Sequence, residues 1–292
     1  MIFHQPVLLV EVLNYMNVAR DTGYFCDCTT GGAGHLLAML KKTRKAKFLG
    51  IEWDQDAIIH AKNRIRPYKD RCFLYKDNFI NLGLILDRLG IKHLSGILFD
   101  LGVSYFQLTT AKRGFGFDRN GVLSMTMSPE NPSLRQKLEH TSRSELISIL
   151  KAYGDVRSHR RIGSEIYENR KKMRTTFELK QLVEKVTPKR FQNKELHKVF
   201  QALRIWVNNE LENLKLGLAV AIDRLEPKGR IVVISYHSGE DRIVKRTFRQ
   251  MHNNGQIRLL HKKVIKPSDE EIEVNPRARS AKLRVGERCG LS

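Results

Sequence analysis

The chain has 292 residues, of which 41% are hydrophobic, and a formal net charge of +21 at pH 7. This length and apolar content allow a sizeable core in one large or two modest domains, and the lack of an apolar run of about 18 residues excludes a membrane-spanning helix. The N-terminus lacks the basic region and the small-residue cleavage site of a secretory leader, so we expect a cytoplasmic protein. The four cysteines have no zinc spacing, so we expect reduced thiols and no metal.

Apolar runs alternate with helical patterns over the first hundred residues. Strands are expected at 23–29, 47–54, 72–78 and 95–102, with helices at 34–43, 55–65 and 79–89 between them. Strands and helices that alternate in this way form βαβ units, whose right-handed crossovers give a parallel sheet. The first part of the chain is therefore expected to be α/β.

Three acidic residues stand at the ends of these strands: Asp27, Glu52 and Asp100. The carboxyl ends of the strands form the ligand crevice of an open α/β sheet. A glycine-rich turn at 29–35 follows the first strand, and Glu52 is placed where a carboxylate can accept both hydroxyls of a ribose. The pattern predicts a pocket for a nucleoside-like cofactor. The turn lacks G-x-G-x-x-G spacing, which makes a nicotinamide dehydrogenase the least favoured alternative.

Only helical patterns follow, from about 108 to 198. Two of them begin with a capping box, Ser142 with Glu145 and Thr175 with Glu178. Apolar residues recur at helical spacing after each box, which predicts amphipathic helices packed on one another. This part of the chain is expected to be an all-helical insertion.

The α/β pattern returns after the insertion. One long helix is expected from near Phe200 to just before Pro227, followed by strand patterns at 229–237, 257–265 and 280–288, with a helix at about 239–251. The simplest account is a Rossmann-like sheet of seven strands, with the last pair antiparallel and no helix between those two strands. Residues 1–107 and 199–292 would form this domain, and residues 108–198 the insertion.

Positive charge is concentrated in two segments. Residues 157–198 contain 13 Lys and Arg against five Asp and Glu, a net of +8, and residues 242–292 have the same counts. Such potential suits a polyphosphate partner, because each neutralised phosphate releases condensed counterions. No amphipathic helix with an aromatic membrane face is evident, so nucleic acid is favoured over a membrane. The candidate RNA ligands, each of which could alone be a solvated surface charge, are Arg157, Arg160, Arg161, Arg170, Lys171, Lys172, Arg174, Arg277, Arg279, Lys282 and Arg284.

Seven blocks of sequence cover nearly the whole chain in order: HQPVLLVEVL, DCTTGGAGH, GILFDLGVSYFQL, RGFGFDRNGVLSMTM, FQALRIWVNNELENL, GRIVVISYHSGEDRIVKRTFR and NPRARSAKLRVGER. Together they resemble the bacterial small-subunit (16S) ribosomal RNA (cytosine-N4)-methyltransferase family, of the MraW or RsmH type. The resemblance implies an S-adenosylmethionine-dependent methyltransferase that modifies the exocyclic N4 of a cytidine in small-subunit ribosomal RNA. It also implies a methyltransferase sheet with an inserted helical domain that recognises the substrate, and a cytoplasmic location.

The resemblance also assigns cofactor contacts residue by residue. They fall on Ala33, Gly34, His35, Glu52, Phe79, Asp100 and Gln107. In this assignment Glu52 accepts the ribose hydroxyls, Phe79 lies against the adenine, and Asp100 and Gln107 flank the sulfonium. Phe79 is explained equally well as a core residue at the start of its helix.

Two residues are expected to act on the target amine. The lone pair of this nitrogen is delocalised into the cytosine ring, so acceptors that bind its protons favour attack and no strong base is required. Asp100 is the expected acceptor, helped by the backbone carbonyls of Leu101 and Gly102. His237 is the second candidate, on the rim of the crevice; the alternative is a helix-start residue beside a capping pair formed by residues 238 and 241.

Five positions depart from the family pattern. Ala33 stands where the family has glycine, and alanine is tolerated there only if the φ of this residue is negative. Ser124, Thr126 and Ser128 replace two acids and an arginine. Gly239 replaces a leucine. These departures leave open a noncatalytic RNA-binding or ribosome-assembly factor on the same fold, as well as a methyltransferase of another RNA, DNA or protein. The long helix that follows the insertion could pack against a second copy, which leaves a homodimer open.

Overall fold

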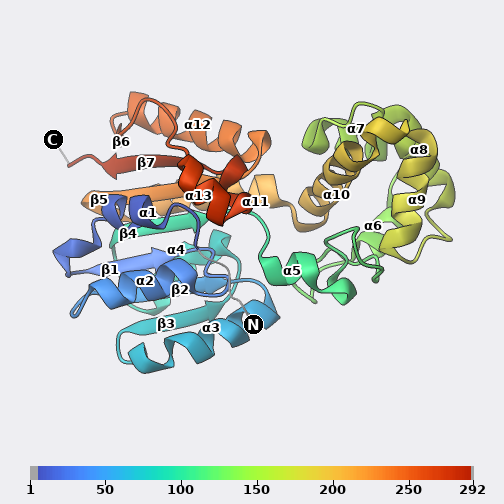
Figure 1. The fold of residues 1–292 in the computed structure, drawn as a ribbon. Helices are drawn as coiled ribbons and strands as arrows, with labels where there is room; N and C mark the ends of the chain where they lie inside the picture. The colour runs from blue at the N-terminus through green and yellow to red at the C-terminus, as the bar shows by residue number, and fades with distance from the viewer. Residues whose placement is uncertain (1–5, 291–292) are drawn as a thin grey trace. The chain divides into compact units, whose positions relative to one another are not determined.

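The structure is a computed structural model of the chain and describes residues 6–290, apart from the side chain of Tyr105 (Figure 1). The chain divides into two compact units. The sheet unit comprises Met1–Gly102 and Leu211–Ser292, and the helical unit comprises Val103–Glu210. The helical unit extends beyond the expected insertion at both ends. Its C-terminal extension arises because the helix Gln192–Asn208 packs on the other helices of the unit.

Seven strands within residues 6–290 form one sheet in the sheet unit (Figure 1). They are β1 (Tyr24–Asp27), β2 (Lys47–Glu52), β3 (Cys72–Lys76), β4 (Leu94–Asp100), β5 (Leu225–Ser235), β6 (Ile257–Leu259) and β7 (Lys282–Arg288). Their order is β3-β2-β1-β4-β5-β7-β6, and only β7 runs antiparallel to its neighbours. The expected fold class is confirmed. The order reverses between β1 and β4, which creates the switch point where such sheets bind ligands.

Helices cover both faces of this sheet (Figure 1). They are α1 (Leu9–Tyr15), α2 (Gly34–Lys42), α3 (Gln55–Ile65), α4 (Leu82–Arg88), α11 (Glu210–Asp223), α12 (Ser238–Asn253) and α13 (Asp269–Val274). Successive strand residues point to opposite faces. Phe25 and Phe48 therefore join the core beneath α1 and α2, whereas Leu49 and Phe99 join the core beneath α4 and α11.

The helical unit has a hydrophobic core of its own. Its helices are α5 (Tyr105–Thr109), α6 (Leu134–His140), α7 (Arg143–Gly154), α8 (His159–Asn169), α9 (Thr176–Val186) and α10 (Gln192–Asn208). The capping box of Thr175 with Glu178 is confirmed at the start of α9. At the start of α7 the side chain of Ser142 accepts the N–H of Glu145. Leu150, Ile162 and Leu203 come from three different helices and are completely buried in this core.

The expectation of one long helix from Phe200 to Pro227 is wrong. Asn209 has a left-handed backbone, with φ 51°, and its N–H bonds to carbonyls of the preceding turn, so α10 ends there and α11 begins at the next residue. Asparagine tolerates this conformation, while the apolar pattern continues across the break. The strand β5 then begins at Leu225 and passes through Pro227 with an irregular register against β4.

The last two strands also differ from expectation. The short helix α13 and a 3-10 helix (Pro276–Ser280) lie between β6 and β7, where no helix was expected. All four cysteines are free thiols. Among the helices of residues 6–290, none combines the length and apolar character needed to cross a membrane.

Candidate active site

The expected acidic residues lie at the carboxyl ends of adjacent strands. Asp27 ends β1, Glu52 ends β2 and Asp100 ends β4. β1 pairs in parallel with both β2 and β4, which brings the three strand ends to one edge of the sheet at its switch point. Asp27 is 1% exposed, whereas Glu52 and Asp100 are half-buried. The three residues therefore end neighbouring strands at one sheet edge and differ in their access to water.

The glycine-rich turn is attached to Glu52 by backbone hydrogen bonds. The N–H of Gly31 donates to Glu52 Oε2 at 2.6 Å, and the N–H of Asp54 donates to Oε1 at 2.7 Å. Gly31 has φ +50°, a conformation that glycine adopts at no steric cost. The Trp53 N–H also bonds to this carboxylate. A carboxylate has about four acceptor positions, so Glu52 retains capacity for a further donor, such as a ribose hydroxyl.

Two other contacts order the same turn. The Asp100 N–H donates to Thr29 Oγ1 at 2.6 Å, and the Arg64 guanidinium donates to the Gly32 carbonyl. The turn is thus held by the end of β4 on one side and by α3 on the other. Its backbone is positioned before any ligand binds, which lowers the entropic cost of binding.

Ala33 adopts a backbone conformation opposite to the one expected. Its φ is +60°, and it is the completely buried N-cap residue of α2. The expectation of a negative φ is wrong, because the turn requires a left-handed residue before the helix whether glycine or alanine stands there. This conformation costs a residue with a Cβ roughly 1–2 kcal/mol. Gly34 follows it, and a Cβ there would lie 2.8 Å from Pro6 Cγ.

Burial changes the acidity of two of the carboxyl groups. It raises the pKa of Asp27 to about 8, and the charges of Asp100 and Glu52 act in the same direction. It raises the pKa of Glu52 to about 7, although the N–H groups of Asp54 and Gly31 oppose the shift. In the ligand-free protein Asp27 is therefore mostly protonated at neutral pH, and Glu52 is near its midpoint. A ligand with positive charge would favour their ionised forms and release those protons.

Asp100 is held by two side chains from neighbouring segments. The Tyr236 hydroxyl donates to Asp100 Oδ1 at 2.7 Å, and His35 Nδ1 lies 3.4 Å from Oδ2. His35 Nε2 lies 2.9 Å from the Val7 carbonyl oxygen. A carbonyl oxygen can only accept, so Nε2 carries the hydrogen of the neutral ring. Nδ1 then donates to Asp100 only when the ring is protonated. Burial and the nearby Asp100 charge raise the pKa of Tyr236, which keeps it a donor.

Sequence reasoning missed Tyr236. It follows β5 directly, and β5 pairs with β4 so that Asp100 lies opposite Ile234. The strand pattern IVVISYH, set beside β4, is the signal that could have found it. Gly102 has φ +100°, a backbone conformation that favours glycine, and it brings the chain beside the Tyr236 ring.

His237 takes the helix-start role. It is the N-cap of α12: its Nδ1 accepts the N–H groups of Gly239 and Glu240 at 3.2 and 3.3 Å, and Glu240 Oε2 accepts the His237 N–H in return. The capping box is therefore 237 with 240, and the expected pair of residues 238 and 241 is wrong. A Cβ at Gly239 would lie 3.0 Å from His237 Nδ1, so the small residue at this family departure leaves space for the ring. A catalytic role for His237 stays a prediction.

Phe79 and Gln107 have structural contacts of their own. Phe79 is half-buried, and its ring packs edge-to-face on Phe99 with centroids 5.3 Å apart, as the core alternative expects. Gln107 belongs to the helical unit, where its side chain accepts the Ser104 N–H at 2.9 Å in the capping box of α5. Their roles beside adenine and sulfonium remain predictions.

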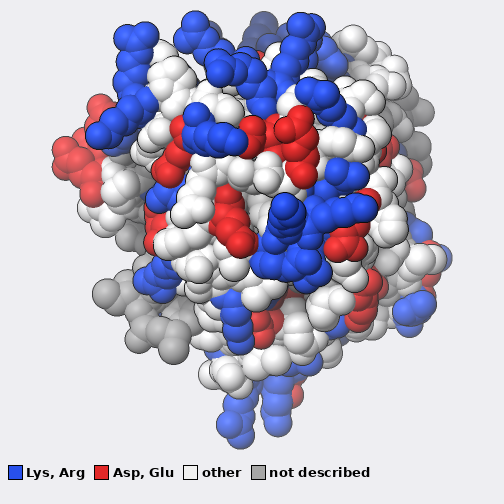
Figure 2. Space-filling model, turned by 90° about the vertical axis from the view of Figure 1, so that its right-hand side faces the viewer, with Lys and Arg blue, Asp and Glu red and all other residues white. Residues whose placement is uncertain are grey.

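The candidate RNA ligands divide into exposed and engaged side chains. In the helical unit all except Arg170, which stacks on Tyr167 at 3.7 Å, are exposed. In the sheet unit, Arg284 and Lys282 lie 2.8 and 3.6 Å from Asp241 and form ion pairs with it. Figure 2 shows Lys and Arg gathered over the upper and central parts of one face, with Asp and Glu between them. Arg277 is half-buried and Arg279 is exposed. The exposed side chains, six in the helical unit and Arg279 in the sheet unit, are therefore the better placed for RNA.

The segment that carries three of the family departures is ordered by a residue that the sequence did not single out. The Asn208 side chain accepts the Met127 N–H at 2.8 Å and donates to the Met125 carbonyl at 2.8 Å. Thr126 Oγ1 donates to the Ser128 carbonyl at 2.6 Å, and Ser128 is 1% exposed. Neutral hydroxyls at these positions keep the loop folded by local bonds, without the charges of the family pattern.

Comparison with known proteins gives a consistent result over the full chain. The model of the MraW methylase family matches residues 1–289. Two curated relatives carry the name ribosomal RNA small subunit methyltransferase H. The one from Persephonella marina is 44% identical over 99% of this chain and 100% of its own length, and the one from Carboxydothermus hydrogenoformans is 39% identical over 99% of both. These matches confirm the resemblance seen in the seven sequence blocks, and the chain belongs to the MraW methylase family.

Proposed function

We propose that this protein transfers a methyl group from S-adenosylmethionine to the exocyclic N4 of a cytidine in small-subunit ribosomal RNA. The observation that carries the proposal is the carboxylate Asp100, held by the Tyr236 hydroxyl at the switch point of a methyltransferase sheet. The names of the relatives support ribosomal RNA as the substrate class. The cytoplasm, where ribosomal subunits assemble in bacteria, is the matching location.

The residues of the crevice fit this cofactor. Glu52 has acceptor capacity for a ribose hydroxyl, and the turn at 31–34 lets backbone approach the ligand. Asp100 supplies a carboxylate, and a bound sulfonium and ammonium would favour the ionised form of Asp27 as well. When bound, the cofactor supplies a methyl group activated by its attachment to positively charged sulfur.

Asp100 is the proposed acceptor for the target amine. A carboxylate that accepts a proton of this amine shifts the nitrogen towards the pyramidal form in which its lone pair can attack. Tyr236 holds one carboxylate oxygen, so the group does not need to reorient during reaction. Asp100 also receives the proton that leaves nitrogen. The target base must leave its stack to reach the crevice.

The helical unit is the proposed substrate-recognition domain. Its exposed arginines can fork onto phosphates and stack on unpaired bases, as structured RNA requires. RNA binding is expected to weaken steeply as salt rises, because each phosphate contact releases counterions.

Mass spectrometry of nucleosides tests the proposal directly. Small ribosomal subunits that lack the modification are incubated with the protein and S-adenosylmethionine, and N4-methylcytidine is expected to appear in their RNA. DNA and protein incubated in parallel are expected to gain no methyl group. Cofactor binding without any N4-methylcytidine would reject the proposed substrate, and no cofactor binding in calorimetry would favour a noncatalytic assembly factor.

Tyr236→Phe tests the positioning role of the hydroxyl. Loss of one hydrogen bond to a charged group is expected to lower kcat about tenfold, with a smaller effect on the KM for cofactor. The acidic limb of the pH–rate profile is expected to move to higher pH, because Asp100 loses a donor that favours its ionised form. Tyr24→Phe, at a ring whose neighbour is Lys47, is the matched control. An unshifted profile in Tyr236→Phe would argue against the positioning role.

A further inference from the structure

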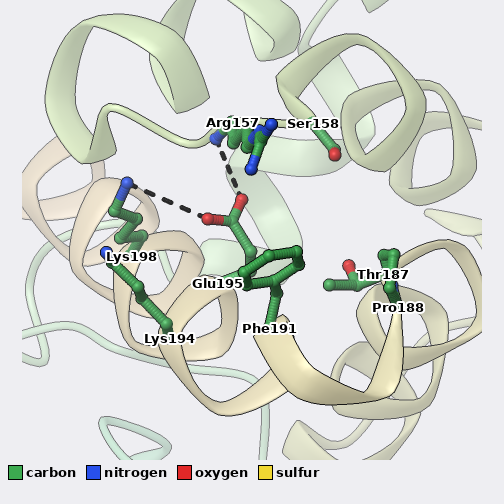
Figure 3. A pocket seen from close by; sticks show the side chains of 8 residues that line it. All are labelled: Arg157, Ser158, Thr187, Pro188, Phe191, Lys194, Glu195 and Lys198. Atoms are coloured by element: carbon green, nitrogen blue, oxygen red, sulfur yellow. Dashed lines mark hydrogen bonds and ion pairs between the residues drawn. The ribbon is translucent and has the colours of Figure 1, made fainter.

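A small cavity lies in the helical unit (Figure 3). It measures about 100 Å³ and is lined by residues 157–158, 187–188 and parts of 191–198. This is well below the roughly 300–1,000 Å³ of pockets that take drug-sized molecules. The cavity, here called the helical-unit pocket, suits one small group and not a whole nucleoside.

Two helices begin at this pocket. Ser158 is the N-cap of α8 and makes no side-chain capping bond. α10 continues from the 3-10 helix Lys189–Phe191, and the N–H of its first residue, Gln192, already donates to the Lys189 carbonyl, so the start of α8 is the one that offers unbonded N–H groups here. The first N–H groups of a helix have no acceptor within the helix and carry the positive end of its dipole. Such helix starts bind anions.

A buried hydroxyl in the pocket has no hydrogen-bond partner. Thr187 is 5% exposed and lines the pocket, and its Oγ1 makes no hydrogen bond within the described chain. In Figure 3 this oxygen lies on the upper edge of the Thr187 side chain, towards Ser158, and a carbon atom forms the end nearest Phe191. Leaving a buried donor unsatisfied costs about 1–3 kcal/mol. An acceptor that enters the pocket would satisfy it.

Cations outnumber acids in the pocket. Arg157, Lys194 and Lys198 line it against the single carboxylate of Glu195. The Glu195 carboxylate is engaged, since its Oε2 accepts the Arg157 N–H at 2.9 Å and its Oε1 lies 3.8 Å from Lys198 Nζ (Figure 3). Within residues 6–290 no carboxylate lies in ion-pair distance of Arg157 or Lys194. These two charges are therefore available to an anion.

The pocket is also preorganised. Lys198 Nζ donates to the Asp155 carbonyl at 2.6 Å, which places its ammonium group beside the loop at 157–158. The Arg157 and Arg190 guanidinium groups lie 5.5 and 4.7 Å from the centre of the Phe191 ring. Ring contacts of this kind hold long cationic side chains in place and lower the entropic cost of binding.

We propose that the helical-unit pocket binds one backbone phosphate of the RNA substrate. A phosphate has the size, the charge and the acceptor oxygens that the cavity, the cations, the start of α8 and the Thr187 hydroxyl require. The choice of RNA as the source of this phosphate rests on the proposed function. A free inorganic phosphate has the same chemistry and is separated from RNA by experiment.

Lys194→Gln in the full-length protein tests the site, because Lys194 is exposed and its loss leaves the core intact. The slope of log affinity for small-subunit RNA against log salt is expected to become shallower by about 0.7 to 0.9, the contribution of one phosphate. Lys151→Gln, at an exposed position on α7 outside the pocket, is the matched control and is expected to keep the wild-type slope. A wild-type slope in Lys194→Gln overturns the proposal.

Thr187→Val provides a second reading. Removing an unpartnered hydroxyl is expected to leave the melting temperature unchanged or higher, while RNA affinity falls roughly threefold to tenfold.

Amide NMR with inorganic phosphate alone and with RNA identifies the source of the bound phosphate. Both ligands are expected to shift the amide signals of residues 159–161 and 192–194. Shifts with inorganic phosphate but not with RNA overturn the RNA assignment. Methyl transfer by the wild-type protein is measured separately, so failure of this site and failure of the proposed function are distinguishable.

Discussion

Replacing Asp100 with asparagine is expected to lower the rate of methyl transfer by about 10²-fold to 10³-fold, the usual loss when a preorganised polar contact to a reacting group is removed. Asparagine keeps one carbonyl oxygen but presents an NH₂ group, which repels the amine protons that the carboxylate would accept. Tyr236 can still donate to the amide oxygen, so the local fold is retained.

Single-turnover kinetics at saturating RNA and cofactor measure this effect, and calorimetry measures cofactor affinity separately. Asp223→Asn changes an exposed carboxylate on α11 and is expected to leave the rate unchanged. Full turnover in Asp100→Asn with normal cofactor binding would remove Asp100 from the mechanism. A loss of cofactor binding alone would restrict Asp100 to the cofactor site.

The ligand-free protein is expected to lose stability as pH rises from about 4 to 8. Burial raises the pKa of Asp27 from 3.8 to about 8, so its contribution is fully present below the unfolded value and is lost as pH rises through the folded value. Glu52 acts in the same direction between 4.5 and about 7. Each group changes the free energy of unfolding by at most about 1.4 kcal/mol per pH unit within its window.

Urea unfolding of wild type and Asp27→Asn at pH 5, 6, 7 and 8 isolates the Asp27 part. The asparagine oxygen can still accept the Thr29 N–H, so the turn is retained. The difference in unfolding free energy between the two proteins is expected to move in favour of the variant by on the order of 1 kcal/mol per pH unit. Asp223→Asn is expected to follow wild type at every pH. Parallel curves for wild type and Asp27→Asn would show that Asp27 ionises normally.

Bound S-adenosylmethionine is expected to reduce the change of the free energy of unfolding with pH. A cation bound at the strand ends favours the ionised carboxylates, so saturating S-adenosylmethionine stabilises the protein more at pH 8 than at pH 5. Equal stabilisation at both pH values would place the positive charges of the ligand away from Asp27 and Glu52.

Much of the sheet unit is determined by local sequence. Buried parallel strands read as short apolar runs, and each of the first four expected strands overlaps an observed one. The acidic strand ends and the glycine turn meet because parallel strands end at the same edge. The helices α7 and α9 and the capping box at Thr175 were predicted equally well, since capping and apolar periodicity are properties of a few neighbouring residues. The expectation of helices alone from 108 to 198 is wrong for residues 114–133, which form no helix and pair through Val122 with Thr175.

The end of the helix α10 and the path of β5 through a proline could not be predicted from the sequence, because no local signal marks them. The apolar period runs on through Asn209, and only the packing of α10 and α11 in different units shows why the helix ends there. The strand β5 passes through Pro227 because its irregular register against β4 accommodates a residue that lacks an N–H.

The sequence by itself therefore determined the fold class, the family and the position of the acidic crevice, because these depend on the order of residues along the chain. The tertiary structure alone decided which side chains from distant segments meet: Tyr236 with Asp100, Asn208 with the loop at 125–127, and Thr187 with the start of α8. Such contacts depend on strand register and helix packing, which bring together residues that no spacing rule along the chain relates.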